Sequence, residues 1–141
     1  MRKWVPSFSE IIDRLSIHQM KEVLIPQHKD KYYNEMMDMV HDLDMMISEH
    51  NIQISGHLIH SIVALSQINA HIWYNEASAR AGETQDLNKL RLTHGLNGIR
   101  SRIMNLISDA ISDTERKDYK ADCLAAEFSD WKMGILSSGD M

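Results

Sequence analysis

Polar residues occupy helix positions at which the apolar spacing of the preceding residues predicts a side chain such as Leu. Residues three and four apart along 58–80 share one side of a helix, because a helix completes a turn every 3.6 residues. This side begins with Leu58, Ile62 and Leu65. It continues with Asn69, Trp73, Glu76 and Arg80. Since burial of an unpaired charge is strongly unfavourable, we expect these groups to be paired, bound to a ligand or in contact with water.

A second polar set occurs in the next predicted helix. Asn97 and Arg100 lie on a side that is otherwise apolar, and Gly95 and Gly98 flank Asn97. A glycine inside a helix costs about 1 kcal/mol relative to alanine. We therefore expect a neighbouring helix or a ligand to come close at this point.

A third polar set belongs to the first predicted helix. Glu10, Arg14 and Lys21 line one face of this helix, and Asp13 lies at the edge of that face. The opposite face is apolar, which is typical of a helix that covers a core. Periodicity alone therefore predicts that the polar face is exposed to solvent.

Two interpretations of these sets involve the basic residues. In the first, the polar groups form a self-satisfied structural network, in which Glu76 pairs with Arg80 while Asn97 and Arg100 close the network between helices. In the second, they form a pocket for a phosphorylated ligand, because a guanidinium suits phosphate oxygens and a tryptophan can stack on a base. The residues assigned to this pocket are Trp73, Arg80 and Arg100, with Lys21 or His94.

A third interpretation is a metal pocket. Glu10, Asp13 and Glu76 are the carboxylates available to hold a hard cation such as Mg²⁺, which would in turn carry phosphates. The basic residues among the three sets favour the anion pocket over the metal pocket.

Three blocks of the sequence, EIIDRLSIHQMK, NAHIWYNEASAR and LNGIR, resemble a known pattern when taken in this order. The pattern is E-x-x-D-x-[LIV]-[ST]-I-x-x-x-K, then N-x-x-[IL]-W-x-x-E-x-x-x-R, then N-x-x-R. It is similar to that of an uncharacterised all-helical family found beside bacterial glycosyltransferases and in tailed-phage genomes. The matching positions are Glu10, Asp13, Leu15, Ser16, Ile17, Lys21, Asn69, Trp73, Glu76, Arg80, Asn97 and Arg100.

The resemblance spans about residues 7–107 and departs from the family at two positions. Gly98 stands where the family has an acid, and Arg102 stands where it tends to have a lysine. The resemblance implies no particular activity. It does imply that the polar face of the first helix belongs with the other two polar sets.

The elements that must position these residues are predicted to be helices. Only two prolines and six glycines interrupt the chain, and no segment alternates with period two for long. Ser7 and Glu10 form a capping-box pattern, and Pro26 closes the first helix. The remaining helices are predicted over about 30–49, 56–81, 84 or 86–112 and, more weakly, 115–133.

The short connections between long helices predict an all-α fold, an antiparallel bundle of four main helices plus a short C-terminal helix. The chain is expected to be one domain, 1–141, with 135–141 as a frayed end. Amphipathic helices of this kind often share a core between chains, so a homo-oligomer is expected.

Composition excludes several classes of partner. A net charge of −5 with scattered lysines argues against duplex nucleic acid. No apolar run has the length of a membrane span. The basic residues of the N-terminus are not followed by an apolar core, so a signal peptide is not expected. A single cysteine favours a reducing cytoplasm. The scattered histidines predicted to lie at the surface are His18, His28, His41, His50 and His71.

The function that these observations favour is non-enzymatic binding of a small phosphorylated ligand, a nucleotide or cyclic nucleotide, with no cofactor. In a phage, such a protein would sequester a nucleotide signal made by host defence. One alternative is a Mg²⁺-dependent all-α nucleotide pyrophosphohydrolase, for which only EIID has the expected acid spacing. Another is a structural adaptor. The predicted ligand-binding residues are Glu10, Asp13, Arg14, Lys21, Asn69, Trp73, Glu76, Arg80, His94, Asn97 and Arg100.

Overall fold

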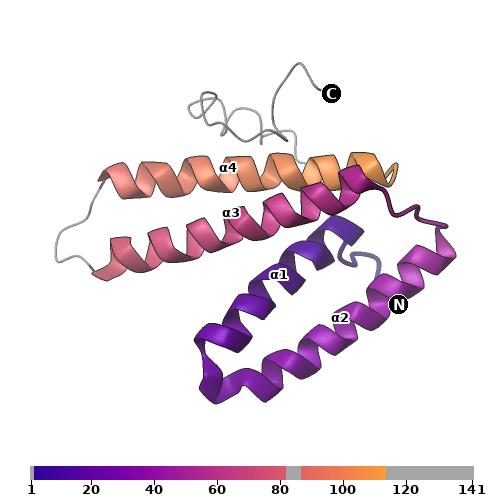
Figure 1. Ribbon diagram of the computed structural model, residues 1–141, viewed down its shortest axis with the longest axis horizontal. Helices are drawn as coiled ribbons and strands as arrows, with labels where there is room; N and C mark the ends of the chain where they lie inside the picture. The colour runs from indigo at the N-terminus through magenta and orange to yellow at the C-terminus, as the bar shows by residue number, and fades with distance from the viewer. Residues whose placement is uncertain (1, 82–86, 114–141) are drawn as a thin grey trace.

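The computed structural model describes residues 2–81 and 87–113, and every regular element within them is helical (Figure 1). The elements in chain order are α1 (Phe8–Leu24), the short 3₁₀-helix η1 (Pro26–His28), α2 (Lys29–Glu49), α3 (Gly56–Ala81) and α4 (Leu87–Ala110). The prediction of an all-α protein with four main helices is confirmed. The predicted helix over 115–133 and the frayed end over 135–141 lie outside the described residues.

The four helices form two antiparallel hairpins (Figure 1). One hairpin consists of α1 and α2 joined by η1, and the other consists of α3 and α4. α1 packs against α2, α3 and α4, whereas the main contacts of α2 are with α1 and η1. α1 is therefore the helix that joins the two hairpins, and the closed antiparallel bundle stays a prediction.

Local hydrogen bonds explain where the helices begin. The backbone N–H of Glu10 donates to Oγ of Ser7, which is the N-cap of α1. The backbone N–H of Leu58 likewise donates to Oγ of Ser55 in front of α3. Each hydroxyl satisfies a donor that the helix leaves unpaired, so the predicted start of α1 is confirmed.

Two helices end at residues with left-handed backbone. Asn51 follows α2 with φ of 50°, and Ser112 follows α4 with φ of 62°. In both cases the next N–H donates back across the last turn, from Ile52 to the Ile47 carbonyl at 3.0 Å and from Asp113 to the Ser108 carbonyl at 2.8 Å. These bonds satisfy carbonyls that the end of a helix leaves unpaired.

The core lies where α1 crosses the α3–α4 hairpin. Its fully buried side chains include Phe8 from α1, Leu65 and Ile68 from α3, and Ile99 and Ile103 from α4. Their three- and four-residue spacing is the one that predicted these helices. α2 adds Leu43 to this cluster, and no helix among the described residues is long and apolar enough to cross a membrane.

The prediction of surface histidines is wrong for His18. Its side chain is mostly buried between α1 and α2, where Nδ1 lies 3.0 Å from the Arg14 carbonyl oxygen and Nε2 lies 2.6 Å from Glu35 Oε2. The ring also meets Tyr32 edge to face. Both ring nitrogens face an acceptor, so the ring donates at both positions when it is protonated. His28, His41, His50 and His71 are exposed, as predicted.

Candidate functional site

Three polar side chains from three helices meet beside the core: Asp13 of α1, Asn69 of α3 and Arg100 of α4. The amide of Asn69 donates to Oδ1 of Asp13 at 2.9 Å, and Nε of Arg100 lies 4.0 Å from the same oxygen. Asn69 is 3% exposed and Asp13 is 8% exposed. We call this set the Asp13–Asn69–Arg100 cluster. A buried carboxylate thus has one hydrogen-bond donor in contact and one cation close by, which is the kind of compensation that burial of charge requires.

A row of polar residues runs along the side of α1 that faces the α3–α4 hairpin, beside the apolar core. Ser9, Asp13 and Ser16 recur at spacings of four and three residues, so they share one side of the helix. The Asn69 amide also reaches Oγ of Ser16 at 3.3 Å, and the Ser108 hydroxyl donates to Oγ of Ser9 at 3.2 Å. The polar groups of this side are therefore satisfied by the neighbouring helices.

This geometry corrects, at the edge of the polar face of α1, the prediction that this face is solvated, whereas Arg14 is exposed as predicted. Asp13, which lies at the edge of that face, is buried. Periodicity missed it because α1 packs on two sides, against α2 and against the α3–α4 hairpin, and the second contact buries polar groups beside apolar ones. Ser16 belongs to the same contact and was absent from the predicted site residues. Its place three residues after Asp13 was the available signal.

Arg100 is only partly satisfied. Its Nε is buried and has no hydrogen-bond partner among the described residues, since Oδ1 of Asp13 is beyond hydrogen-bond distance. The side chain as a whole is 30% exposed. A buried N–H of a cation without an acceptor is unfavourable, so an acceptor oxygen at this point would stabilise the site.

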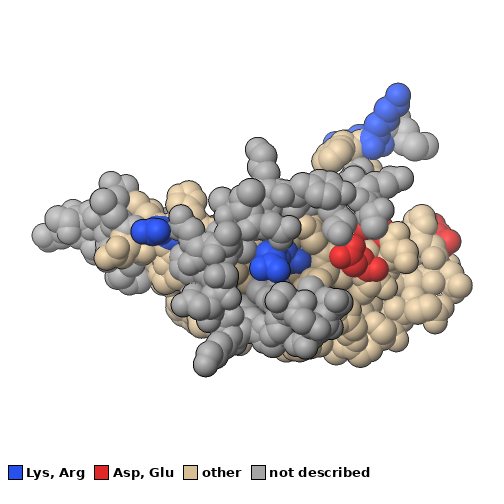
Figure 2. Space-filling model, turned by 90° about the horizontal axis from the view of Figure 1, so that it is seen from above, with Lys and Arg blue, Asp and Glu red and all other residues tan. Residues whose placement is uncertain are grey.

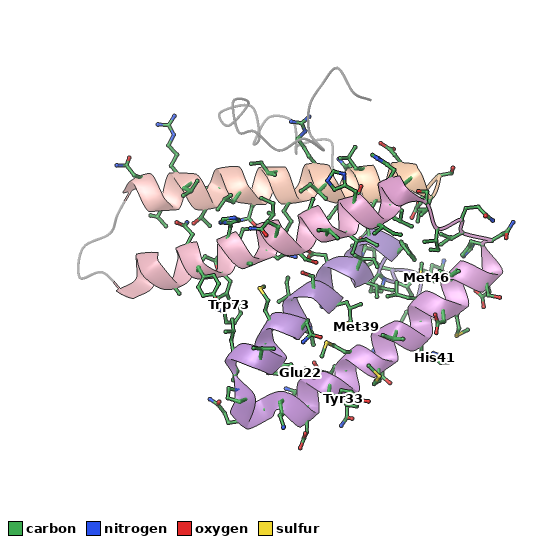
Figure 3. All side chains as sticks on the ribbon, in the orientation of Figure 1. Glu22, Tyr33, Met39, His41, Met46 and Trp73 are labelled. Carbon is green, nitrogen blue, oxygen red and sulfur yellow. The ribbon has the colours of Figure 1, made fainter. Side chains whose placement is uncertain are left out.

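Trp73 and Glu76 continue from Asn69 along α3, and both are half-buried. Trp73 is one turn beyond Asn69, and Figure 3 shows it on the side of α3 that faces α1. Arg80 lies one turn beyond Glu76 in α3, and its side chain is outside the described residues. The N-terminal part of the predicted side of α3 therefore belongs to the core. Its C-terminal part lies at the edge of the molecule, where α1 no longer covers α3 (Figure 1).

Four predicted site residues point elsewhere. Arg14 is exposed and lines a different hollow with residues of α2. Nζ of Lys21 lies 5.8 Å from the centre of the Tyr32 ring, so this lysine also faces α2. His94 is exposed on α4. The Asn97 amide donates to the Thr93 carbonyl of its own helix at 3.0 Å.

The carboxylates proposed as metal ligands do not form a metal centre. Glu10 is half-buried one turn before Asp13. Nowhere in the described ranges do three His, Cys, Asp or Glu side chains come together closely enough to hold a metal ion. The Asp13 carboxylate is surrounded by a hydrogen-bond donor and a cation, whereas coordination of Mg²⁺ requires several oxygen ligands.

Three hollows lined by described residues do not include Asp13, Asn69 or Arg100. One of about 470 Å³ includes Ser16 and lies between α1, α2 and α3. Another of about 610 Å³ lies on the other side of the α1–α2 hairpin. A third of about 530 Å³ lies at the end of α4, next to His50 and Asp113.

Comparison with known proteins adds no relative: no family model matches the chain, and neither the curated proteins nor the solved structures contain a match to it.

Proposed function

We propose that the chain binds a small phosphorylated ligand at the Asp13–Asn69–Arg100 cluster and does not convert it. The observation that carries the proposal is the buried Nε of Arg100 without an acceptor. Phosphate oxygens are strong acceptors, and the guanidinium fork can donate to two of them at once.

The residues of the cluster are buried to different extents, and this difference suits the binding of a ligand. Asn69 and Asp13 are buried and bonded to each other, so they fix the floor of the site. Arg100 is partly exposed, so a ligand can approach its guanidinium from the surface. The Asp13 carboxylate also holds the guanidinium near the cluster without occupying its Nε donor.

Trp73 supports a nucleotide as the ligand. It follows Asn69 by one helical turn, about 6 Å along the axis, and is half-buried. A half-buried indole on the helix that carries Asn69 offers a surface on which the base of a nucleotide can stack. In a phage, a protein that binds a nucleotide without consuming it would lower the free concentration of a nucleotide signal of host defence.

A structural network is the second candidate, and the 2.9 Å bond between Asn69 and Asp13 favours it. In this case the cluster fixes how α1 crosses α3 and has no ligand. A Mg²⁺-dependent pyrophosphohydrolase is less well supported, because the described part of the chain holds no cluster of three potential metal ligands. The homo-oligomer and the cytoplasmic location stay predictions.

Replacement of Arg100 tests the proposal. We expect a panel of nucleotides, cyclic dinucleotides and nucleotide sugars to contain a ligand that raises the melting temperature of the wild-type protein without Mg²⁺. A ligand at a hundred times its Kd adds about 2.7 kcal/mol to the free energy of unfolding. Arg100→Gln should abolish this increase, because it removes the charge and the fork. Arg14→Gln is the matched control and should leave the increase unchanged, since Arg14 lines another hollow.

Three results would contradict the proposal. Loss of the increase in Arg14→Gln but not in Arg100→Gln would place the site elsewhere. If no ligand changes the melting temperature and Arg100→Gln only lowers that of the free protein, the cluster is a structural network. Mg²⁺-dependent loss of the nucleotide, followed by chromatography, would show that the protein is an enzyme.

A further inference from the structure

A histidine and a glutamate connect α1 to α2 close to the turn that joins these helices. His18 lies within two turns of the end of α1, and Glu35 lies within two turns of the start of α2. Nε2 of the ring is 2.6 Å from Oε2 of the carboxylate. The His18 side chain is 14% exposed, so water screens this interaction on few sides. We call it the His18–Glu35 contact.

The surroundings of the His18 ring fit only one of its protonation states. Nε2 faces the Glu35 carboxylate, and Nδ1 lies 3.0 Å from the backbone carbonyl oxygen of Arg14. A neutral imidazole has one N–H and one lone pair, so in either tautomer one nitrogen would point its lone pair at an oxygen. An imidazolium ion donates to both oxygens. The contact is therefore complete only when a second proton is held between Nε2 and Oε2.

No other charged group among the described residues contacts the ring. α2 adds the Tyr32 ring, which meets His18 edge to face. On α1, Nζ of Lys21 lies over the far part of the same contact, 5.8 Å from the centre of the Tyr32 ring, and Glu22 accepts a hydrogen bond from its own helix. Lys and Arg side chains that are visible from the α4 side of the molecule (Figure 2) are not among the contacts of the ring. The charge of the ring is therefore compensated by Glu35.

The start of α2 has few other interactions that hold it in place. No side chain of the described residues caps α2, whereas Ser7 caps α1. Met36 and Leu43 are the only side chains of α2 that are buried. A helix that buries little apolar surface depends more strongly on its polar contacts. Loss of the contact with His18 should therefore loosen the N-terminal half of α2 first.

We propose that protonation of His18 regulates how firmly α2 is held against α1. Histidine is the side chain whose charge ordinarily changes between about pH 5 and pH 8. Because the folded contact needs the second proton, it stabilises the fold at the acidic end of this range and is lost as the pH rises. The α1–α2 hairpin is therefore held most firmly under mildly acidic conditions, and the N-terminal half of α2 opens more often under mildly alkaline ones.

The chain contains a second histidine–carboxylate contact that serves as a matched control. His41 and Asp42 are neighbours on α2, with Nδ1 3.3 Å from Oδ1, and their side chains are 71% and 64% exposed. An exposed pair of this kind contributes little to stability. His18→Gln and His41→Gln each remove one ionisable ring, so only the first should change the pH dependence of stability.

Urea denaturation at about pH 5.5 and about pH 8 measures the effect. We expect His18→Gln to lower the ratio of folded to unfolded protein about five to ten times more at the acidic pH, because only there does the wild type hold the second proton. His41→Gln should change this ratio equally at both pH values, within about twofold. Native-state hydrogen exchange should locate the effect of His18→Gln in the amides of α2 around Tyr32–Met36 rather than in α3.

Glu35→Gln gives a second test that does not require His18→Gln to fold. The side-chain amide of a glutamine can donate to Nε2 of a neutral ring, while Nδ1–H still donates to the Arg14 carbonyl. The contact is then complete without the second proton. We therefore expect Glu35→Gln to be less stable than the wild type at about pH 5.5, and as stable or more stable at about pH 8.

The proposal is overturned if His18→Gln lowers the ratio of folded to unfolded protein equally at both pH values, or if His41→Gln shows the same pH dependence. It is also overturned if the stability difference between Glu35→Gln and the wild type is the same at both pH values. None of these measurements involves a nucleotide or Arg100, so failure here leaves the ligand-binding proposal intact.

Discussion

Asn69 is the residue on which the polar contact between α1 and α3 depends. Its amide donates to a carboxylate oxygen of Asp13 and reaches the hydroxyl of Ser16. Because Asp13 is buried, water cannot replace the lost donor at low cost. The 2.9 Å bond is therefore a stabilising contact whether or not the cluster also binds a ligand.

Asn69→Ala is expected to lower the free energy of unfolding by about 2 kcal/mol or more, since a hydrogen bond to a charged group is worth about 1.5–3 kcal/mol. Urea denaturation monitored by circular dichroism measures this change. Gln67→Ala on the same helix is the control, because Gln67 is exposed and its amide contacts the exposed His71, and its cost should stay within about 0.5 kcal/mol. Equal effects of the two substitutions would show that the bond to Asp13 contributes nothing.

At the scale of single elements, the ends of the helices are set by local hydrogen bonds. α4 ends in a motif in which Ser112 has left-handed backbone and the N–H groups of Ser112 and Asp113 donate back to Asp109 and Ser108. A residue with a Cβ is strained in this conformation, whereas glycine is not. The end of α4 thus retains strain that a single substitution can remove.

Ser112→Gly is expected to raise the free energy of unfolding by about 1 kcal/mol. The same substitution inside α4, Ser101→Gly, should lower it by about 0.5 kcal/mol, because glycine is a poorer helix former than serine. Thermal unfolding of both variants beside the wild type tests the pair. A loss of stability in both would mean that the left-handed end does not form in solution.

At the scale of the whole molecule, α1 is the helix through which the hairpins contact each other. α3 and α4 pack along each other and contact α1, whereas α2 packs mainly on α1 and leaves Tyr33, Met37 and Val40 partly exposed. A helix with one packed side loses few contacts when it opens. Stability is therefore distributed unevenly between the two hairpins.

Native-state hydrogen exchange should show this difference. We expect backbone amides of α2 around Met36–Leu43 to exchange faster than those of α3 around Leu65–Ile68 and of α4 around Ile99–Ile103, since opening of α2 exposes less apolar surface. Uniform protection across the helices would contradict the two-hairpin description.

Much of the fold could be predicted from the sequence because the relevant signals are local. The apolar spacing of Leu58, Ile62 and Leu65 in α3 predicted a buried side, and the structure buries Leu58 and Leu65 fully and Ile62 in part. Ser7 and Pro26 predicted where the first helix begins and ends. Capping and periodicity act over a few residues, so they need no knowledge of the neighbouring helices.

What the sequence determined by itself is the set of helices and the presence of polar groups on the buried side of α3. Which residues meet Asn69 was decided only by the tertiary structure. Asp13 and Ser16 do so, whereas Arg14 and Lys21, on the same polar face of α1 as Asp13, contact the α2 side instead. The physical reason is that α1 packs on two sides. Periodicity defines faces within a helix, but only the crossing of helices decides which neighbour each face meets.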